Sequence, residues 1–227
     1  MPHKHQSAGT EGPKKILLVD DHPMLLEGIQ QYLQQDQGLT VCGQAHTAAE
    51  ALTLMQQLKP DLLIVDIGLP GRDGLELIKD IRALNSTCLI LVFSMFDEEL
   101  YAERVLRAGA QGYVMKHESP LKLVQAIRGV LAGELVAGPG IVQRALRRTA
   151  DGRGDQPASP MTLLTDRELE IFRLIGAGHQ RTEIARRLNL SVKTFEVHRA
   201  KIRQKLNLRN AAELFLHASQ FVHGLNH

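Results

Sequence analysis

The sequence contains little cysteine and no apolar run long enough to cross a membrane. Of its 227 residues only Cys42 and Cys88 are cysteines, and each lies within an apolar stretch. We expect both to be small core residues rather than a disulfide or a metal-binding pair. The first 15 residues are polar and lack the apolar segment of a signal peptide, and no stretch approaches the ~20 apolar residues of a membrane span. These absences predict a cytoplasmic protein with no membrane partner.

Apolar residues make up 44% of the chain, which is enough for a buried core. The charges are unevenly distributed. Residues 161–227 contain 11 Lys and Arg and 6 Asp and Glu, a net charge of +5. The whole chain has 27 Lys and Arg and 25 Asp and Glu, so the remaining residues have 16 and 19, a net charge of −3. A basic C-terminal third is compatible with binding to a polyanion, although an ordinary solvated surface explains the charge equally well.

Short apolar runs alternate with helical patterns over about 120 residues. Five apolar runs predict strands, at 16–19, 39–43, 62–65, 89–93 and 112–115. Five helical patterns lie between and after them, at 23–35, 47–58, 73–84, 97–108 and 119–132. Continuous apolar runs are typical of parallel strands that are covered on both faces. The alternation therefore predicts a doubly wound α/β domain with a five-stranded parallel sheet.

The predicted organisation has four parts. Residues 1–13 are polar and are expected to form a disordered tail, and the α/β domain covers 14–133. Residues 134–160 form a linker with a short helix near 141–148, and 161–227 form a small all-α domain. Gly, Pro and Asp are frequent at 149–160, which is typical of a flexible segment with a reach of at most ~40 Å.

Polar side chains follow four of the predicted strands, at the point where each strand ends. Asp20 and Asp21 follow the first strand and Asp66 the third, and Ser94 and Lys116 follow the fourth and fifth. The carboxyl ends of the strands meet at one edge of such a sheet, so these groups are expected to converge. Carboxylates gathered there favour Mg²⁺, beside which one of them can attack a phosphoryl group. A single Asp at such a position is more often a loop or helix cap, whereas the set of five points to a site.

Residues 15–132 resemble a response-regulator receiver domain. The resemblance is carried by Asp20 and Asp21, by the segment 66–74 (DIGLPGRDG), by Ser94 and by the segment 112–116 (GYVMK). It implies that Asp66 is the phospho-acceptor. It also implies that Mg²⁺ is held by Asp21, Asp66 and the Gly68 carbonyl, with Asp20 acting through water.

The same resemblance implies roles for three further residues. Ser94 and Lys116 would bind the phosphoryl group, and a sensor histidine kinase would donate it. Tyr113 would be the switch aromatic, with half-buried packing as the alternative. Many receivers have Pro after the Lys, where this chain has His117, and the geometry of that loop is therefore open.

The C-terminal third has a purely helical pattern. Thr165 and Glu168 have the spacing of a capping box at the start of the first helix. A second helix over about 180–188 and a third over about 192–206 are separated by a turn of three residues, which is the geometry of a helix-turn-helix. The exposed face of the third helix has small or polar residues and a basic rim. This face fits the DNA major groove, although a solvated helix surface is an even alternative.

Residues 164–218 resemble a DNA-binding domain of the LuxR/FixJ (NarL-like) type. The resemblance is carried by Leu164, Thr165, Arg167, Glu168, Gly178, the segment 183–185 (EIA), Leu188, Ser191, the segment 193–199 (KTFEVHR), Ile202, Lys205 and Leu206. It implies that 192–206 is a recognition helix for double-stranded DNA, with contacts from Lys193, Thr194, Glu196, Val197, Arg199, Ala200, Lys201, Arg203 and Lys205. Phe195 replaces the usual Val, and 180–182 (QRT) replaces the common Ser-Asn-Lys. These departures leave individual phosphate contacts open.

The resemblance also implies a dimerisation helix over about 210–222. We expect a small contact between two copies of the chain from Ala211, Leu214, Leu216 and Phe221. A homodimer is expected when the receiver is phosphorylated, because two half-sites on DNA can then be bound together. RNA polymerase is a further candidate partner.

These features predict a phosphorylation-controlled, DNA-binding transcription regulator that is not an enzyme. An aspartyl-phosphate phosphatase is disfavoured because such enzymes have Asp two residues after the nucleophile, where this chain has Gly68. A small-ligand sensor needs an apolar pocket in the first domain, whereas this strand edge is acidic. A regulator that works without phosphate would be favoured by the loss of a pocket residue, and none is lost.

The two domains are expected to communicate through docking. We expect the unphosphorylated receiver to dock on the second domain and to hinder its recognition helix or its dimer contact. A phosphoryl group on Asp66 would then draw Ser94 inward and let Tyr113 fill the vacated space. A difference of a few kcal/mol in the affinity of the two states for the phosphoryl group is enough to shift the population.

Overall fold

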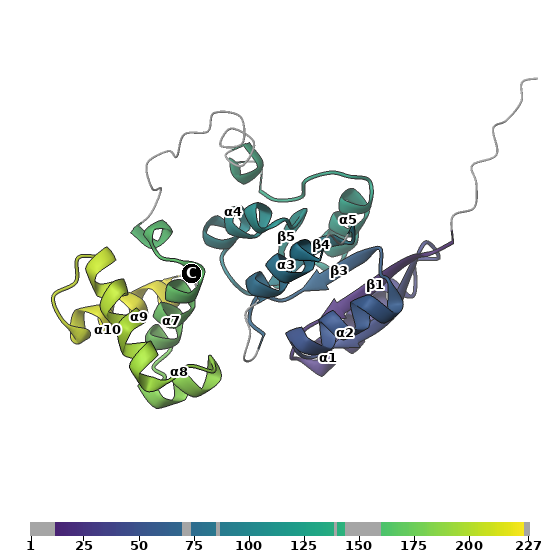
Figure 1. Cartoon of the computed structure of the whole chain (residues 1–227). Helices are drawn as coiled ribbons and strands as arrows, with labels where there is room; N and C mark the ends of the chain where they lie inside the picture. The colour runs from purple at the N-terminus through teal and green to yellow at the C-terminus, as the bar shows by residue number, and fades with distance from the viewer. Residues whose placement is uncertain (1–11, 70–73, 85–86, 139, 144–159, 225–227) are drawn as a thin grey trace, which may run out of the picture.

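The first domain is a parallel sheet, seen in a computed structural model that describes residues 12–69, 74–84, 87–138, 140–143 and 160–224 (Figure 1). The strands are β1 (Lys14–Val19), β2 (Leu39–Ala45), β3 (Leu62–Val65), β4 (Leu89–Ser94) and β5 (Gly112–Met115). Their order is β2-β1-β3-β4-β5. Val19 pairs with Val65, and Val65 pairs with Val92, so the residues that follow these strands share one edge. The predicted five-stranded parallel sheet is confirmed.

Helices cover both faces of this sheet. They are α1 (Pro23–Leu33), α2 (Ala48–Leu58), α3 (Gly74–Ala83), α4 (Glu98–Ala108) and α5 (Pro120–Leu131). Successive side chains of a strand point to opposite faces. Leu17 and Leu63 therefore pack with α2, α3 and α4, whereas Leu18 and Ile64 pack with α1 and α5. Burial on both faces explains why the strands are continuously apolar.

The chain after α5 remains attached to the first domain. Val136 donates its backbone N–H to the Gln111 carbonyl at 2.9 Å and accepts from Tyr113 N–H at 2.7 Å, so it adds a short bridge at the edge strand β5. Gly138 N–H donates to Glu98 of α4 at 2.7 Å, and Ile141 is buried. The domain therefore extends beyond residue 133, the boundary that we expected.

The C-terminal domain consists of helices packed around a small core. They are α7 (Asp166–Gly176), α8 (Arg181–Arg187), α9 (Val192–Lys205) and α10 (Ala211–Gly224), preceded by a 3₁₀ turn at Pro160–Leu163. Thr165 and Glu168 form the expected capping box at the start of α7. Phe172, Phe195 and Ile202 fill the core from α7 and α9. The predicted all-α helix-turn-helix domain is confirmed.

Several expectations concern residues outside the described part of the chain. Residues 1–11 of the expected tail and residues 70–73 of the segment 66–74 lie outside it. Residues 144–159, where we expected most of the short helix and of the flexible segment, also lie outside it. Within the described ranges, no helix is both long and apolar enough to span a bilayer. No described peptide bond is cis, so the Lys116–His117 bond is trans.

Candidate functional site

The polar residues at the strand ends form one compact, mostly buried cluster. Asp66, directly after β3, accepts a hydrogen bond from Ser94 Oγ at 2.6 Å. Lys116 Nζ lies 2.7 Å from Asp66 Oδ2 and 2.6 Å from Asp20 Oδ2. The sheet register explains this arrangement, because each of these residues lies at the carboxyl end of a neighbouring strand. The structure thus brings four of the five predicted side chains into direct contact.

Lys116 neutralises the two buried carboxylates. Burial by itself would lower the pKa of Lys116, but the charges of Asp66 and Asp20 and their hydrogen bonds outweigh burial and raise it. Lys116 is therefore protonated at neutral pH, and its ammonium group is within reach of any anionic group attached to Asp66.

Asp21 is the fifth predicted residue and lies at the mouth of the cluster. Its Oδ1 atom is buried without a hydrogen-bond partner of acceptable geometry, although His22 Nδ1 is 2.9 Å away. Oxygen atoms of Asp20 and Asp21 and a ring nitrogen of His22 all lie within 4.8 Å of one another. A buried carboxylate oxygen without a suitable donor fits a cation-binding role.

His22 was missed by the sequence reasoning. Its Nδ1 atom lies 3.0 Å from Asp20 Oδ1, and this hydrogen bond and the charge of Asp21 raise the pKa of His22. The signal was available, since His22 follows the two aspartates directly in the sequence. Gly68 lies close to Asp66, because a Cβ at this position would stand 3.4 Å from Asp66 Oδ2.

Tyr113 is already buried beneath the loop that follows β4. Its hydroxyl donates to the Phe96 carbonyl at 2.7 Å, and burial raises its pKa far above the ordinary value. Tyr113 thus already lies in a buried position, rather than the half-buried one of the alternative interpretation, and its role as a switch stays a prediction. Ser94 likewise already contacts Asp66.

The ring of Phe96 connects this loop to the C-terminal domain, and it was also missed. Phe96 packs against Tyr101 with ring centroids 5.2 Å apart. The guanidinium carbon of Arg173, from α7, lies 3.2 Å from the centroid of the Phe96 ring. Nothing in the sequence pairs Phe96 with Arg173, because these residues belong to different domains.

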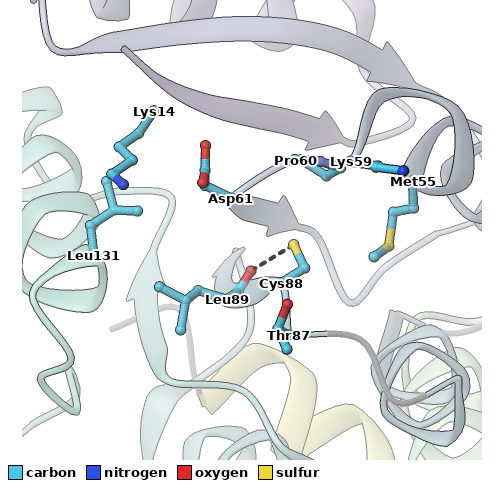
Figure 2. A pocket seen from close by; sticks show the side chains of 9 residues that line it. All are labelled: Lys14, Met55, Lys59, Pro60, Asp61, Thr87, Cys88, Leu89 and Leu131. Atoms are coloured by element: carbon cyan, nitrogen blue, oxygen red, sulfur yellow. Dashed lines mark hydrogen bonds between the residues drawn. The ribbon is translucent and has the colours of Figure 1, made fainter. Parts of the chain in front are cut away.

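A hollow of about 490 Å³ lies at the edge of the sheet opposite to Asp66, and Cys88 is among the residues that line it (Figure 2). The Cys88 thiol donates to the Leu89 carbonyl at 3.3 Å. Burial raises the pKa of Cys88 to about 12, so little thiolate forms at neutral pH. Neither cysteine forms a disulfide; Cys88 is buried, as expected of a core residue, and Cys42 is half-buried.

The recognition helix α9 is accessible along its predicted outer face. Lys193, Thr194, Val197, Ala200 and Lys201 are exposed, and 48% of the Val197 surface is open to solvent. Phe195 and Ile202 face the core instead. The helix thus presents a small, largely uncharged centre with basic residues around it.

Some of the predicted rim residues are engaged within the domain. Lys205 Nζ lies 2.6 Å from Glu168 Oε2, so it neutralises a buried carboxylate and is not a free cation for DNA. Arg199 Nη2 lies 2.5 Å from Glu196 Oε2. Arg203 is half-buried and donates to the Arg209 carbonyl at 3.4 Å. Among the expected basic contacts, Lys193 and Lys201 are the most accessible.

The predicted dimer residues are divided between two faces of α10. Leu214 is 1% exposed and belongs to the domain core, so it cannot contact a second chain, whereas Phe221 is half-buried and packs edge-on against Phe172 at 5.5 Å. Leu216, which is 55% exposed, and Ala211 lie open. The error arose because residues two apart on a helix point to different faces.

Comparisons with known proteins agree with both domains. Residues 16–128 match the model of the response regulator receiver domain, and residues 162–218 match that of bacterial regulatory proteins of the luxR family. Response regulator GacA of Pseudomonas aeruginosa is 34% identical over 211 residues, covering 93% of this chain and 97% of that protein. The nitrate/nitrite response regulator NarL of Escherichia coli is 34% identical over 207 residues, covering 88% and 93%.

Solved structures of similar proteins also match both domains of this chain. RcsB of Salmonella typhimurium matches with a TM-score of 0.70 and 27% identity, over 92% of this chain and 98% of that chain. RcsB bound to promoter rprA with the phosphomimetic BeF₃⁻ matches with a TM-score of 0.66 and 29% identity, over 92% and 99%. The chain therefore belongs to the two-component response regulators that join a receiver domain to a LuxR-type helix-turn-helix domain. It is a transcription regulator under the control of phosphorylation.

Proposed function

We propose that Asp66 is the phospho-acceptor and that a sensor histidine kinase donates the phosphoryl group. The observation that carries this proposal is the position of the Asp66 carboxylate, which is buried at the strand edge between the hydroxyl of Ser94 and the ammonium group of Lys116. Both donors can turn to phosphoryl oxygens once Asp66 is modified, because each is already within hydrogen-bond distance of the acceptor.

Magnesium is the cofactor that the donor set fits best. Asp21, Asp66 and the Gly68 carbonyl would hold the ion, with Asp20 acting through water, and the orphaned oxygen of Asp21 supports this assignment. When bound, the ion offsets the negative charge that two reacting anions bring together. Lys116 and Ser94 then position the acceptor and hold the transferred group, and the protein does no further chemistry on a substrate.

The acceptor is tested by mass spectrometry with the small donor phosphoramidate and Mg²⁺. The wild-type chain should gain one phosphoryl group that is labile to base, and Asp66→Asn should gain none. The control variant Asp61→Asn removes a carboxylate at the opposite edge of the sheet and should label normally. Full labelling of Asp66→Asn would place the acceptor elsewhere.

The partner of the second domain is proposed to be double-stranded DNA. The exposed outer face of α9 supports this proposal, as do the promoter-bound structures of RcsB. A homodimer, with Ala211 and Leu216 of α10 at the contact, would read two half-sites. RNA polymerase is a further proposed partner, and binding to chromosomal DNA would place the protein in the cytoplasm.

A further inference from the structure

One carboxylate of α7 is clamped by two cations of the receiver. Lys79 Nζ of α3 lies 2.6 Å from Asp166 Oδ2, and Arg104 Nη1 of α4 lies 2.9 Å from Asp166 Oδ1. Arg104 also donates to the Met161 carbonyl at 2.9 Å. Burial favours neutral Asp166, but the hydrogen bonds from Lys79 and Arg104 outweigh burial and hold its pKa below the usual range. This clamp fixes the first turn of α7 on the receiver.

Arg173 makes a second contact two helical turns further along α7. Besides lying over the ring of Phe96, its Nη1 atom is 3.5 Å from the Tyr101 hydroxyl. Asp166 and Arg173 are seven residues apart, so they lie on the same face of α7. One face of α7 therefore rests on α3, on α4 and on the loop that follows Ser94.

The docked helices close a cavity of about 520 Å³ over the acceptor. Its walls come from both domains and include Asp21, Asp66 and Lys116 on the receiver, and Glu170, Arg173 and Arg187 on α7 and α8. Among the described residues, none of α9 or α10 lines it. Figure 1 shows α7 on the side of the C-terminal domain that faces the receiver.

Docking leaves the DNA-binding surface uncovered. Val197 and Lys201 are exposed in the docked chain, as is the apolar pair Phe215 and Leu216 on α10. The expectation that docking hinders the recognition helix or the dimer contact is thus wrong for this arrangement, because α7 and α8 provide the docked surface. What docking covers is the phospho-acceptor.

We propose that the docked C-terminal domain selects phosphodonors by size. Small acyl phosphates and phosphoramidates reach Asp66 through the cavity, and the phosphohistidine of a kinase reaches it only after α7 leaves the receiver. This proposal rests on the proposed role of Asp66 as acceptor. In every transfer an Asp66 oxygen attacks phosphorus and the P–O or P–N bond to the donor breaks. A carboxylate departs as an anion, whereas an amine or imidazole takes a proton from solvent.

The dimensions support this selection. Cavities of roughly 300–1,000 Å³ hold drug-sized molecules, so this one has room for a donor as small as phosphoramidate. A kinase presents phosphohistidine on a folded domain, and even a single helix is ~10–12 Å wide. Such a helix has to approach where α7 already places Glu170 and Arg173.

The test compares two donors on full-length chains. One is phosphoramidate, and the other is a histidine phosphotransfer domain whose histidine has been phosphorylated with phosphoramidate. Asp166→Asn combined with Arg173→Ala removes both anchors, and Lys79→Ala weakens the clamp without altering α7. The control Lys122→Ala breaks an ion pair with Glu118 on the receiver surface. Thermal unfolding of each variant verifies that it is folded.

The measured quantity is the labelling rate with the protein donor divided by the rate with phosphoramidate. We expect it to rise at least fivefold in the double variant, less in Lys79→Ala, and not in Lys122→Ala. An unchanged ratio, which includes equal acceleration with both donors, overturns the proposal that docking selects donors by size. If phosphoramidate labels no chain, or also labels Asp66→Asn, the proposed acceptor is wrong instead.

Discussion

The strand edge that carries Asp66 and the outer face of α9 differ in their exposure. Asp66 is buried, bonded to Ser94 and Lys116, and covered by α7. Val197 at the centre of the recognition face stands open in the same docked chain. Coupling between two sites is reciprocal. If phosphorylation of Asp66 weakens docking of the two domains, docking in turn disfavours phosphorylation of Asp66. With Asp66 as the proposed acceptor, this difference favours pairing of two chains, rather than the uncovering of α9, as the step that strengthens DNA binding.

The largest expected effect is a loss of stability. It compares Lys116, in the cluster around Asp66, with Lys201, on the outer face of α9. Lys116→Ala leaves the adjacent, buried carboxylates of Asp20 and Asp66 without their shared ammonium partner, so we expect the free energy of unfolding to fall by about 3–5 kcal/mol. Lys201→Ala removes an exposed cation and should change it by less than about 0.5 kcal/mol. Urea denaturation measures both. Millimolar Mg²⁺ should restore part of the loss in Lys116→Ala, and equal effects of the two substitutions would contradict the description of the cluster.

The receiver site was largely predictable from sequence, and the reason is geometrical. Parallel strands end at one edge, so Asp20, Asp66, Ser94 and Lys116 had to converge once the apolar runs were assigned to a sheet. That α7 and α8 provide the docked surface was not predictable, because the sequence of an expected linker does not define the orientation of two domains. The clamp on Asp166 depends on that orientation alone.

The second prediction separates the two faces of α10. Leu214→Ala should destabilise the C-terminal domain by about 2–5 kcal/mol, because Leu214 is fully packed in its core. Leu216→Ala should leave stability within about 0.5 kcal/mol and weaken dimerisation instead. Chemical denaturation and analytical ultracentrifugation of the phosphorylated chain measure the two effects. Loss of stability in Leu216→Ala would show that this face is not free.

The third prediction tests whether the open face of α9 reads DNA. Lys201→Ala should weaken binding to all sequences alike and reduce the salt slope by about one. Val197→Ala should instead change the sequence preference, since Val197 lies at the centre of the face. Fluorescence anisotropy over a range of salt concentrations and a panel of operators measures both quantities. If the rim and centre variants behave alike, the helix enters the groove in another orientation.

The smallest effect concerns His198, which lies on the inner side of α9. Its Nδ1 atom is buried without a hydrogen-bond partner, and burial lowers its pKa below the ordinary value of 6.5. The folded state thus binds a proton less readily than the unfolded state. The neutral form contributes stability that is present above pH 6.5 and is lost as the pH falls through the lowered pKa. Because His198 is partly exposed, we expect the loss in the free energy of unfolding to be well below 1 kcal/mol.

Urea denaturation at pH 7.5 and pH 5.5 measures the free energy of unfolding. It should fall between these pH values in the wild type and fall less in His198→Gln. An NMR titration of the His198 ring that gives a pKa at or above 6.5 would contradict the burial of Nδ1.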